Sequence, residues 1–235
     1  MVDLSTFDGM LILYFCAEWC NACKSDSTTS GVNTSDSKAT EVLTQLYERK
    51  EEIAKSANCN DIEIIQISAD DNEMQFINFY SRSPWLAIPF EESIRIKNNI
   101  DRFNVAKIPH VAIVKVANGD TTIINPNAAT DIIDSSVDLM NFPFVPSPIT
   151  DISRSLDSYG FNINERPSLV LLMETSTSDS IKSHVYESLL PLAQKLSTDK
   201  IGDVDGPRML FFHAFEQSAQ ANKIRSNLLP LSLSS

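Results

Sequence analysis

The stretch MLILYFCAEWCNAC, residues 10–23, joins a short apolar run to two closely spaced cysteines. Its first six residues have the length and the continuous hydrophobicity of a buried strand. Cys20 and Cys23 follow, with two residues between them. Where thiols are kept reduced, such a pair is typical of redox chemistry or metal binding, and not of a structural disulfide. The stretch therefore predicts a thiol site at the end of a buried strand.

Zinc binding is the weaker of these two interpretations. Structural zinc usually takes two pairs of Cys or His ligands, and the sequence offers no second close pair. Cys16 and Cys59 could complete a site only with awkward geometry. We therefore expect neither a metal nor another cofactor.

Composition excludes several other classes of protein. The chain has 235 residues, 43% of them hydrophobic, and a formal net charge of −12. This charge disfavours nucleic-acid binding, which needs a clustered basic surface. No apolar run is long enough to span a bilayer, and MVDLSTFDGM at residues 1–10 does not resemble a secretory signal. We therefore expect a cytoplasmic or nuclear protein that binds neither nucleic acid nor membranes.

Residues 1–140 predict a mixed α/β sheet. Strands and helices are expected to alternate at 10–15, 39–57, 62–69 and 72–82. The candidate caps of the second helix are Asp70, Asp71 and Asn72. Two further strands flank Asn118-Gly119, which is a strong signal for a hairpin turn. Parallel crossovers followed by an antiparallel hairpin are expected to give one sheet covered on both faces.

Residues 167–235 repeat this order in a shorter form. The proline-marked segment 141–166 is expected to be a linker. Beyond it, a strand, a helix, a strand and a helix are expected at 167–174, 178–196, 207–215 and 218–229. No cysteine pair follows the first of these strands, where TSTSDS stands instead. The second half therefore predicts an incomplete unit without a redox site.

A cysteine pair between a buried strand and a helix can exchange disulfides. The first thiol is expected to be exposed, with its thiolate stabilised by N–H groups at the helix start. It attacks a substrate disulfide, and the second thiol then attacks the mixed disulfide and releases the reduced product. This order makes Cys20 the predicted nucleophile and Cys23 the resolving thiol. Trp19 before the pair and Ile108-Pro109 before a later strand strengthen this interpretation.

Three segments carry a resemblance to a known family. YFCAEWCNAC, ISADDNEMQFINFYSRSPWLAIPF and FNVAKIPHVAIVKVANGD resemble the tryparedoxin and nucleoredoxin family of thioredoxin-fold proteins. The second half resembles the C-terminal part of nucleoredoxins. The resemblance implies a thioredoxin-like fold followed by a truncated thioredoxin-like unit. It also implies that Trp19, Ile108 and Pro109 contact the substrate, with a cis bond before Pro109.

The activity implied by this resemblance is reduction of disulfides in proteins. Members of the family also bind signalling partners in a redox-dependent manner, among them Dishevelled in the Wnt pathway. Three functions therefore stay open: a protein-disulfide reductase, a redox-gated binding protein with negligible turnover, and a catalytically inactive scaffold.

Several positions depart from the family's pattern. Asn21-Ala22 replaces the usual pair of prolines, and Tyr14 stands where thioredoxins have a buried acid. Residues 24–38, rich in residues that compete with helix hydrogen bonding, are expected to form an exposed insertion. Cys16 is interpreted as a buried hydrophobic residue more readily than as a third redox thiol. His110 is expected either to face Cys20 or to be exposed.

Overall fold

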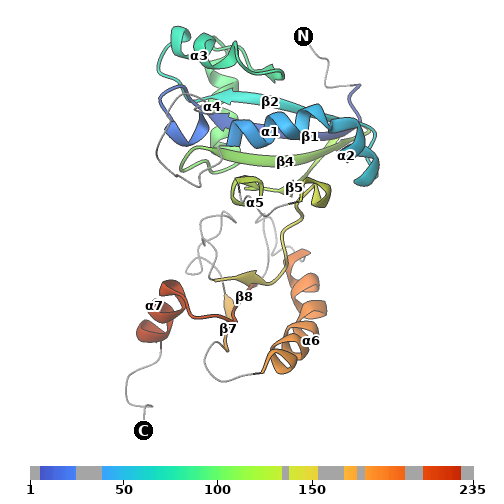
Figure 1. Ribbon diagram of the computed structural model, residues 1–235, viewed down its shortest axis with the longest axis vertical. Helices are drawn as coiled ribbons and strands as arrows, with labels where there is room; N and C mark the ends of the chain where they lie inside the picture. Colours follow the sequence, from blue (N-terminus) through green and yellow to red (C-terminus); the bar gives the residue numbers. More distant parts are fainter. Residues whose placement is uncertain are drawn as a thin grey trace. The chain divides into compact units, whose positions relative to one another are not determined.

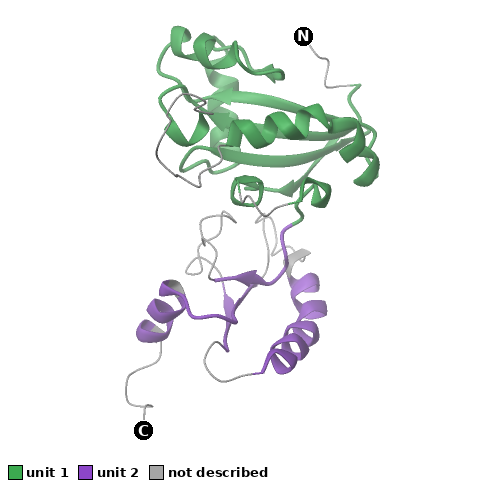
Figure 2. Ribbon diagram, viewed as in Figure 1, with its two compact units in different colours: residues 1–145 green, residues 146–235 purple. Residues whose placement is uncertain are grey.

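The computed structural model describes residues 6–24, 39–133, 138–152, 167–173, 178–198 and 209–228. The chain divides into two compact units, residues 1–145 and 146–235 (Figure 2). The predicted insertion at 24–38 lies outside the described residues, apart from Lys24. No helix within the described ranges is long and apolar enough to cross a membrane.

The first unit is built on a five-stranded sheet with the order β3-β2-β1-β4-β5 (Figure 1). The strands are β1 (Gly9–Cys16), β2 (Ile62–Ser68), β3 (Leu86–Ala87), β4 (His110–Ala117) and β5 (Asp120–Asn125). β1 pairs in parallel with β2 and antiparallel with β4. All its residues are buried, as expected of a continuous apolar run between two neighbours. The first residue of β1 is a glycine, and a larger residue would not fit there, because its Cβ would lie 2.3 Å from the Asp61 carbonyl oxygen.

Helices cover both faces of this sheet. They are α1 (Ala39–Glu48), α2 (Lys50–Ser56), α3 (Glu73–Tyr80), α4 (Ser93–Arg102) and α5 (Ala129–Ile133). Successive side chains of a strand point to opposite faces. Ile12 and Tyr14 therefore pack with the buried residues of α1, α2 and α5, and Phe15 packs with those around α4. The mixed, doubly covered α/β sheet is confirmed.

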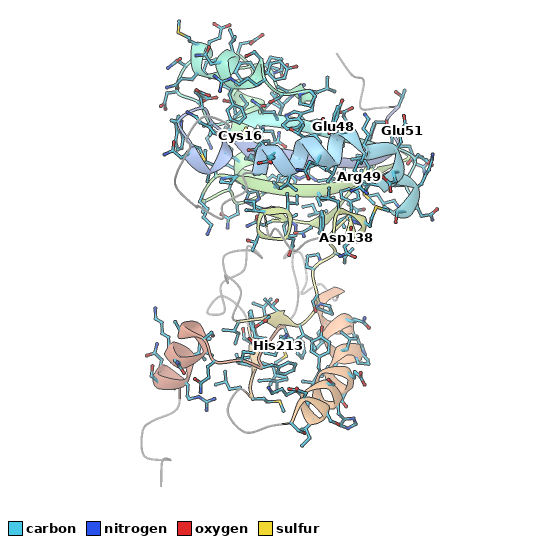
Figure 3. The ribbon with its side chains drawn as sticks, in the orientation of Figure 1. Cys16, Glu48, Arg49, Glu51, Asp138 and His213 are labelled. Carbon is cyan, nitrogen blue, oxygen red and sulfur yellow. The ribbon has the colours of Figure 1, made fainter. Side chains whose placement is uncertain are left out.

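Local signals in the sequence match most of these elements. The Asn72 side chain accepts a hydrogen bond of 3.0 Å from the Gln75 amide and caps α3. Asn118 and Gly119 both have positive φ, 54° and 83°, which is the conformation that a tight hairpin turn requires. The single helix expected over 39–57 is wrong, because the chain bends at Arg49 between α1 and α2 (Figure 3). The Arg49 amide there is shared between the Gln45 and Leu46 carbonyls, each at 3.2 Å.

The second unit contains a parallel three-stranded sheet with the order β6-β8-β7. Its elements are β6 (Thr150–Asp151), β7 (Ser168–Leu172), α6 (Asp179–Thr198), β8 (Leu210–Ala214) and α7 (Ala219–Leu228). Residues of α6 pack on one face of the sheet and residues of α7 on the other. The strand-helix-strand-helix order is the predicted one. The segment expected to be a linker, 141–166, contributes β6 to this sheet.

Candidate active site

The cysteine pair lies in a tight turn directly after β1. The Cys20 amide donates to the Ala17 carbonyl, and the Cys23 amide donates to the Cys20 carbonyl, each at 3.1 Å. Residues Asn21–Cys23 form one 3-10 turn, η1, and Lys24 is already extended. Among the described residues the next helix begins only at Ala39. The predicted helix behind Cys20 is therefore reduced to one turn, whose few aligned peptide dipoles stabilise a thiolate less than a full helix would.

Both cysteines are free thiols, and each lies in contact with the other. The expectation that Cys20 is exposed is wrong, because only 6% of its surface is accessible, against 0% for Cys23. Burial raises the pKa of Cys23, and the contact with Cys20 raises it further. The Ala17 amide and the Tyr14 hydroxyl oppose this rise. Cys20 is thus the outer thiol, and Cys23 is an inner thiol held in its protonated form at neutral pH.

The segment before Cys20 is anchored to the end of β2. The Glu18 amide donates to the Asp70 carboxylate at 2.7 Å, and that carboxylate also accepts from the Ser68 hydroxyl at 2.7 Å. Asp70 therefore fixes this loop, while Asn72 provides the cap of α3. The Trp19 indole N–H donates to the Ala69 carbonyl at 3.3 Å, and the ring remains 52% exposed. These contacts hold Trp19 at the surface beside the cysteine turn.

An apolar pocket of about 160 Å³ lies next to this loop. Its lining residues are Phe15, Trp19, Ala69, Ile100, Val105, Ala106, Lys107 and Ile108. The structure thus brings together Trp19 and Ile108, two of the residues expected to contact substrate. The bond between Ile108 and Pro109 is cis, as expected.

His110 takes neither of the two expected positions. Its ring is 4% exposed, packs edge-on against Phe15, and lies 2.9 Å from the Pro126 carbonyl through Nε2. Burial lowers the pKa of this imidazole. Both expectations for His110 are therefore wrong, since its hydrogen bond goes to Pro126 and its surface is buried.

Cys16 ends β1 and is fully buried (Figure 3). Burial raises its pKa well above the usual thiol value, and nearby Cys23 raises it further. It packs in the same cluster of buried residues as Tyr14 and both active-site cysteines. This position fits the interpretation as a small buried hydrophobic residue.

One contact of the site was not predicted from the sequence. The Tyr14 hydroxyl lies 2.9 Å from the Thr40 hydroxyl and 3.4 Å from the Cys23 carbonyl oxygen. The Thr40 hydroxyl also donates to that carbonyl. Thr40 belongs to the first turn of α1, beyond the predicted insertion. A threonine at a helix start was its only signal in the sequence.

The described residues contain no group of three or more His, Cys, Asp or Glu side chains that could hold a metal ion.

Comparison with known proteins identifies the first unit. A family model described as thioredoxin-like matches residues 8–121. Tryparedoxin from Trypanosoma brucei brucei is 32% identical over 144 residues, which cover 61% of this chain and 85% of that protein. The chain belongs to the thioredoxin-like family. It is homologous to nucleoredoxin and to tryparedoxin.

Nucleoredoxins match both halves of this thioredoxin-like chain. The protein from Xenopus laevis is 28% identical over 218 residues, covering 91% of this chain and 46% of the relative. The mouse (Mus musculus) protein is also 28% identical, over 217 residues and 44% of its length. The chain thus spans about half the length of these relatives. The solved structure of tryparedoxin from Trypanosoma brucei is 29% identical, covers 62% of this chain and 86% of its own, and gives a TM-score of 0.47.

Proposed function

We propose that this chain is a protein-disulfide reductase in which Cys20 attacks the substrate and Cys23 resolves the intermediate. The observation that supports this most is the contact between an outer and an inner thiol at the end of β1. The Cys20 thiolate attacks one sulfur of the substrate disulfide and displaces the other as a thiolate. Cys23 then attacks Cys20, and its proton passes to the second departing sulfur. The products are a reduced substrate and a Cys20–Cys23 disulfide, which an external thiol must reduce before the next cycle.

Trp19, Ile108 and Pro109 are the proposed substrate-binding residues. Trp19 is half exposed, and it lines the same apolar pocket as Ile108. An apolar side chain beside the substrate disulfide could fill this pocket and bury surface worth about 25 cal/mol per Å². We therefore propose protein disulfides flanked by hydrophobic residues as the substrate class.

A second candidate is a redox-gated binding protein with negligible turnover. The observation that favours it is the 6% exposure of Cys20, which limits access by a bulky disulfide. The partner would then be a signalling protein, such as Dishevelled, in the cytoplasm or nucleus. This choice of partner and compartment rests on the resemblance to nucleoredoxins.

An insulin-reduction assay with dithiothreitol separates these functions. We expect the chain to accelerate insulin precipitation, Cys20→Ser to abolish the acceleration, and Cys59→Ser to preserve it. Cys59 is a matched control because it is a half-buried thiol outside the cysteine turn. Equal activity of Cys20→Ser and the unchanged chain would refute the proposed nucleophile. No acceleration by the unchanged chain, together with partner binding that depends on oxidation, would support the second candidate.

A further inference from the structure

The resolving cysteine is held by two hydroxyl groups from different elements. Tyr14 lies on β1 and is fully buried, and Thr40 lies in the first turn of α1. Both hydroxyls approach the Cys23 carbonyl oxygen, and they lie 2.9 Å from each other. The Cys23 carbonyl oxygen thus accepts hydrogen bonds from both the central strand and the covering helix.

We propose that Tyr14 and Thr40 are positioning residues for the resolving thiol, and that their hydroxyls act specifically when Cys23 attacks the mixed disulfide. This inference rests on the proposed role of Cys23. It concerns the second chemical step and leaves the attack by Cys20 unaffected.

The arrangement of protons supports a division of labour between the two hydroxyls. Thr40 has one hydroxyl proton, which it donates to the Cys23 carbonyl, so its oxygen can accept from Tyr14. Hydrogen bonding from the Tyr14 hydroxyl also lowers the pKa of the Cys23 thiol. Thr40 therefore fixes the turn. The single Tyr14 proton can turn from the oxygen atoms around it to the Cys23 sulfur as negative charge develops there.

Tyr14 is suited to remain a donor throughout the reaction. Burial raises the pKa of its phenol well above the usual value, and the neighbouring Cys16 and Cys23 raise it further. The phenol therefore stays protonated at neutral pH. During resolution it donates a hydrogen bond without giving up its proton, and the proton of Cys23 leaves on the released substrate thiol.

Thr40 matters in this chain because η1 does not continue into a helix in the described residues. Lys24 is extended, and α1 begins at Ala39. The packing of Leu43 and Leu46 in the core fixes α1 in place. The Thr40 hydroxyl bond ties the cysteine turn to this fixed helix, which is a connection that a continuous helix would supply through its backbone.

The two chemical steps can be followed separately with an aromatic disulfide that releases thionitrobenzoate. The first release reports attack by Cys20, and the second reports resolution by Cys23. The parent is the full chain carrying Cys59→Ser. The same chain with Cys23→Ser lacks the proposed resolving thiol and shows what a single release looks like. The test variants are Tyr14→Phe, Thr40→Val and Thr40→Ser. Thr44→Val is the matched control, because the Thr44 hydroxyl donates to the Thr40 backbone carbonyl and, within the described residues, makes no hydrogen bond to the cysteine turn.

We expect Tyr14→Phe and Thr40→Val each to slow the second release about tenfold or more. Tyr14→Phe removes a hydrogen bond to the developing thiolate, and Thr40→Val leaves the Cys23 carbonyl without the Thr40 donor. The first release should stay within about twofold of the parent, as expected where Cys20 keeps its surroundings. Thr40→Ser should resolve faster than Thr40→Val, since serine restores the hydroxyl while valine restores only the shape. Thr44→Val should match the parent in both releases.

Results of two kinds would overturn the inference, and a further result would refute the proposed function on which it rests. An unchanged second release in Tyr14→Phe and Thr40→Val would show that the hydroxyls are not used. Equal slowing of both releases, or a Thr40→Ser variant slower than Thr40→Val, would indicate a purely structural role. A parent that gives a single release, like Cys23→Ser, would instead refute Cys23 as the resolving thiol, and so is distinguishable from the first two.

Discussion

β1 and β7 are the strands that precede the first α-helix of each unit, and they lie in different surroundings. β1 is paired on both sides and all its residues are buried. β7 pairs with β8 and lies at the edge of the sheet formed by the described residues. All its residues are half-buried. β1 leads into Cys20 and Cys23, whereas the sequence after β7 has no cysteine.

This difference shows what a thiol site requires from a fold of this type. An inner thiol needs a central strand that carries it beneath covering helices, together with partners such as Tyr14 on the same strand. A half-buried strand at the edge of a small sheet does not provide such an interior. The strand that leads into the cysteine pair is therefore paired on both edges and covered on both faces, whereas the strand that leads into α6 is paired on one edge in the described sheet.

The largest predicted effect is a loss of stability when a leucine is truncated to alanine in each of the two strands. Leu11→Ala removes a buried side chain from β1 and should destabilise the first unit by about 2–5 kcal/mol. Leu169→Ala removes a half-buried side chain from β7 and should cost the second unit roughly 1–2 kcal/mol. Hydrogen exchange followed by mass spectrometry reports each unit separately. An equal or larger loss for Leu169→Ala would contradict the difference in enclosure.

A smaller effect concerns one histidine in each unit, His110, which is buried, and His213, which is half-buried. Burial lowers the pKa of both His110 and His213, so below about pH 6.5 the unfolded chain binds more protons than the folded one. Stability should therefore fall as the pH drops from 7 to 5. His110→Gln keeps an N–H for the Pro126 carbonyl and removes the titration, which should flatten this loss in the first unit.

His213→Gln should flatten the loss in the second unit only. Each unit of pKa shift corresponds to about 1.4 kcal/mol. Unfolding followed by hydrogen exchange at pH 5, 6 and 7 would measure both effects. A pH dependence that neither substitution changes would show that other groups control acid stability.

The smallest effects come from helix caps. The Asn72 side chain caps α3 in the first unit, and the Ser218 hydroxyl accepts from the Ala221 amide at the start of α7 in the second. Asn72→Ala and Ser218→Ala should each cost about 1 kcal/mol, confined to the unit that carries the substitution. Asn78→Ala on the exposed surface of α3 is the matched control and should change stability by no more than about 0.5 kcal/mol. A substitution that destabilises both units would show that they unfold together.

Signals that act over a few residues were readable from the sequence. The apolar run of β1, the Asn118-Gly119 turn and the Asn72 cap all depend on neighbours along the chain, and all three are present. The helix α4 was missed although Ile96, Ile100 and Phe103 have helical spacing, because polar and charged residues dominate the segment between them. The two-residue strand β6 was missed because its existence depends on pairing with β8, far along the chain.

The candidate site shows the same limit. The cysteine pair is a short motif, the cis bond before Pro109 was implied by the family resemblance, and the structure contains both. The burial of Cys20, the bond of His110 to Pro126 and the contact of Thr40 with Cys23 all arise from tertiary packing. Thr40 and Cys23 are separated by the predicted insertion, so no local pattern could associate them.

The most direct test of the central claim is to identify which thiol holds the substrate. The chain carrying Cys23→Ser is incubated with an oxidised protein substrate, and the trapped species is mapped by non-reducing peptide mass spectrometry. We predict a mixed disulfide at Cys20, which persists because the resolving thiol is gone. A mixed disulfide at Cys16 or Cys59, or the absence of any trapped species, would contradict the assignment of Cys20 as the nucleophile.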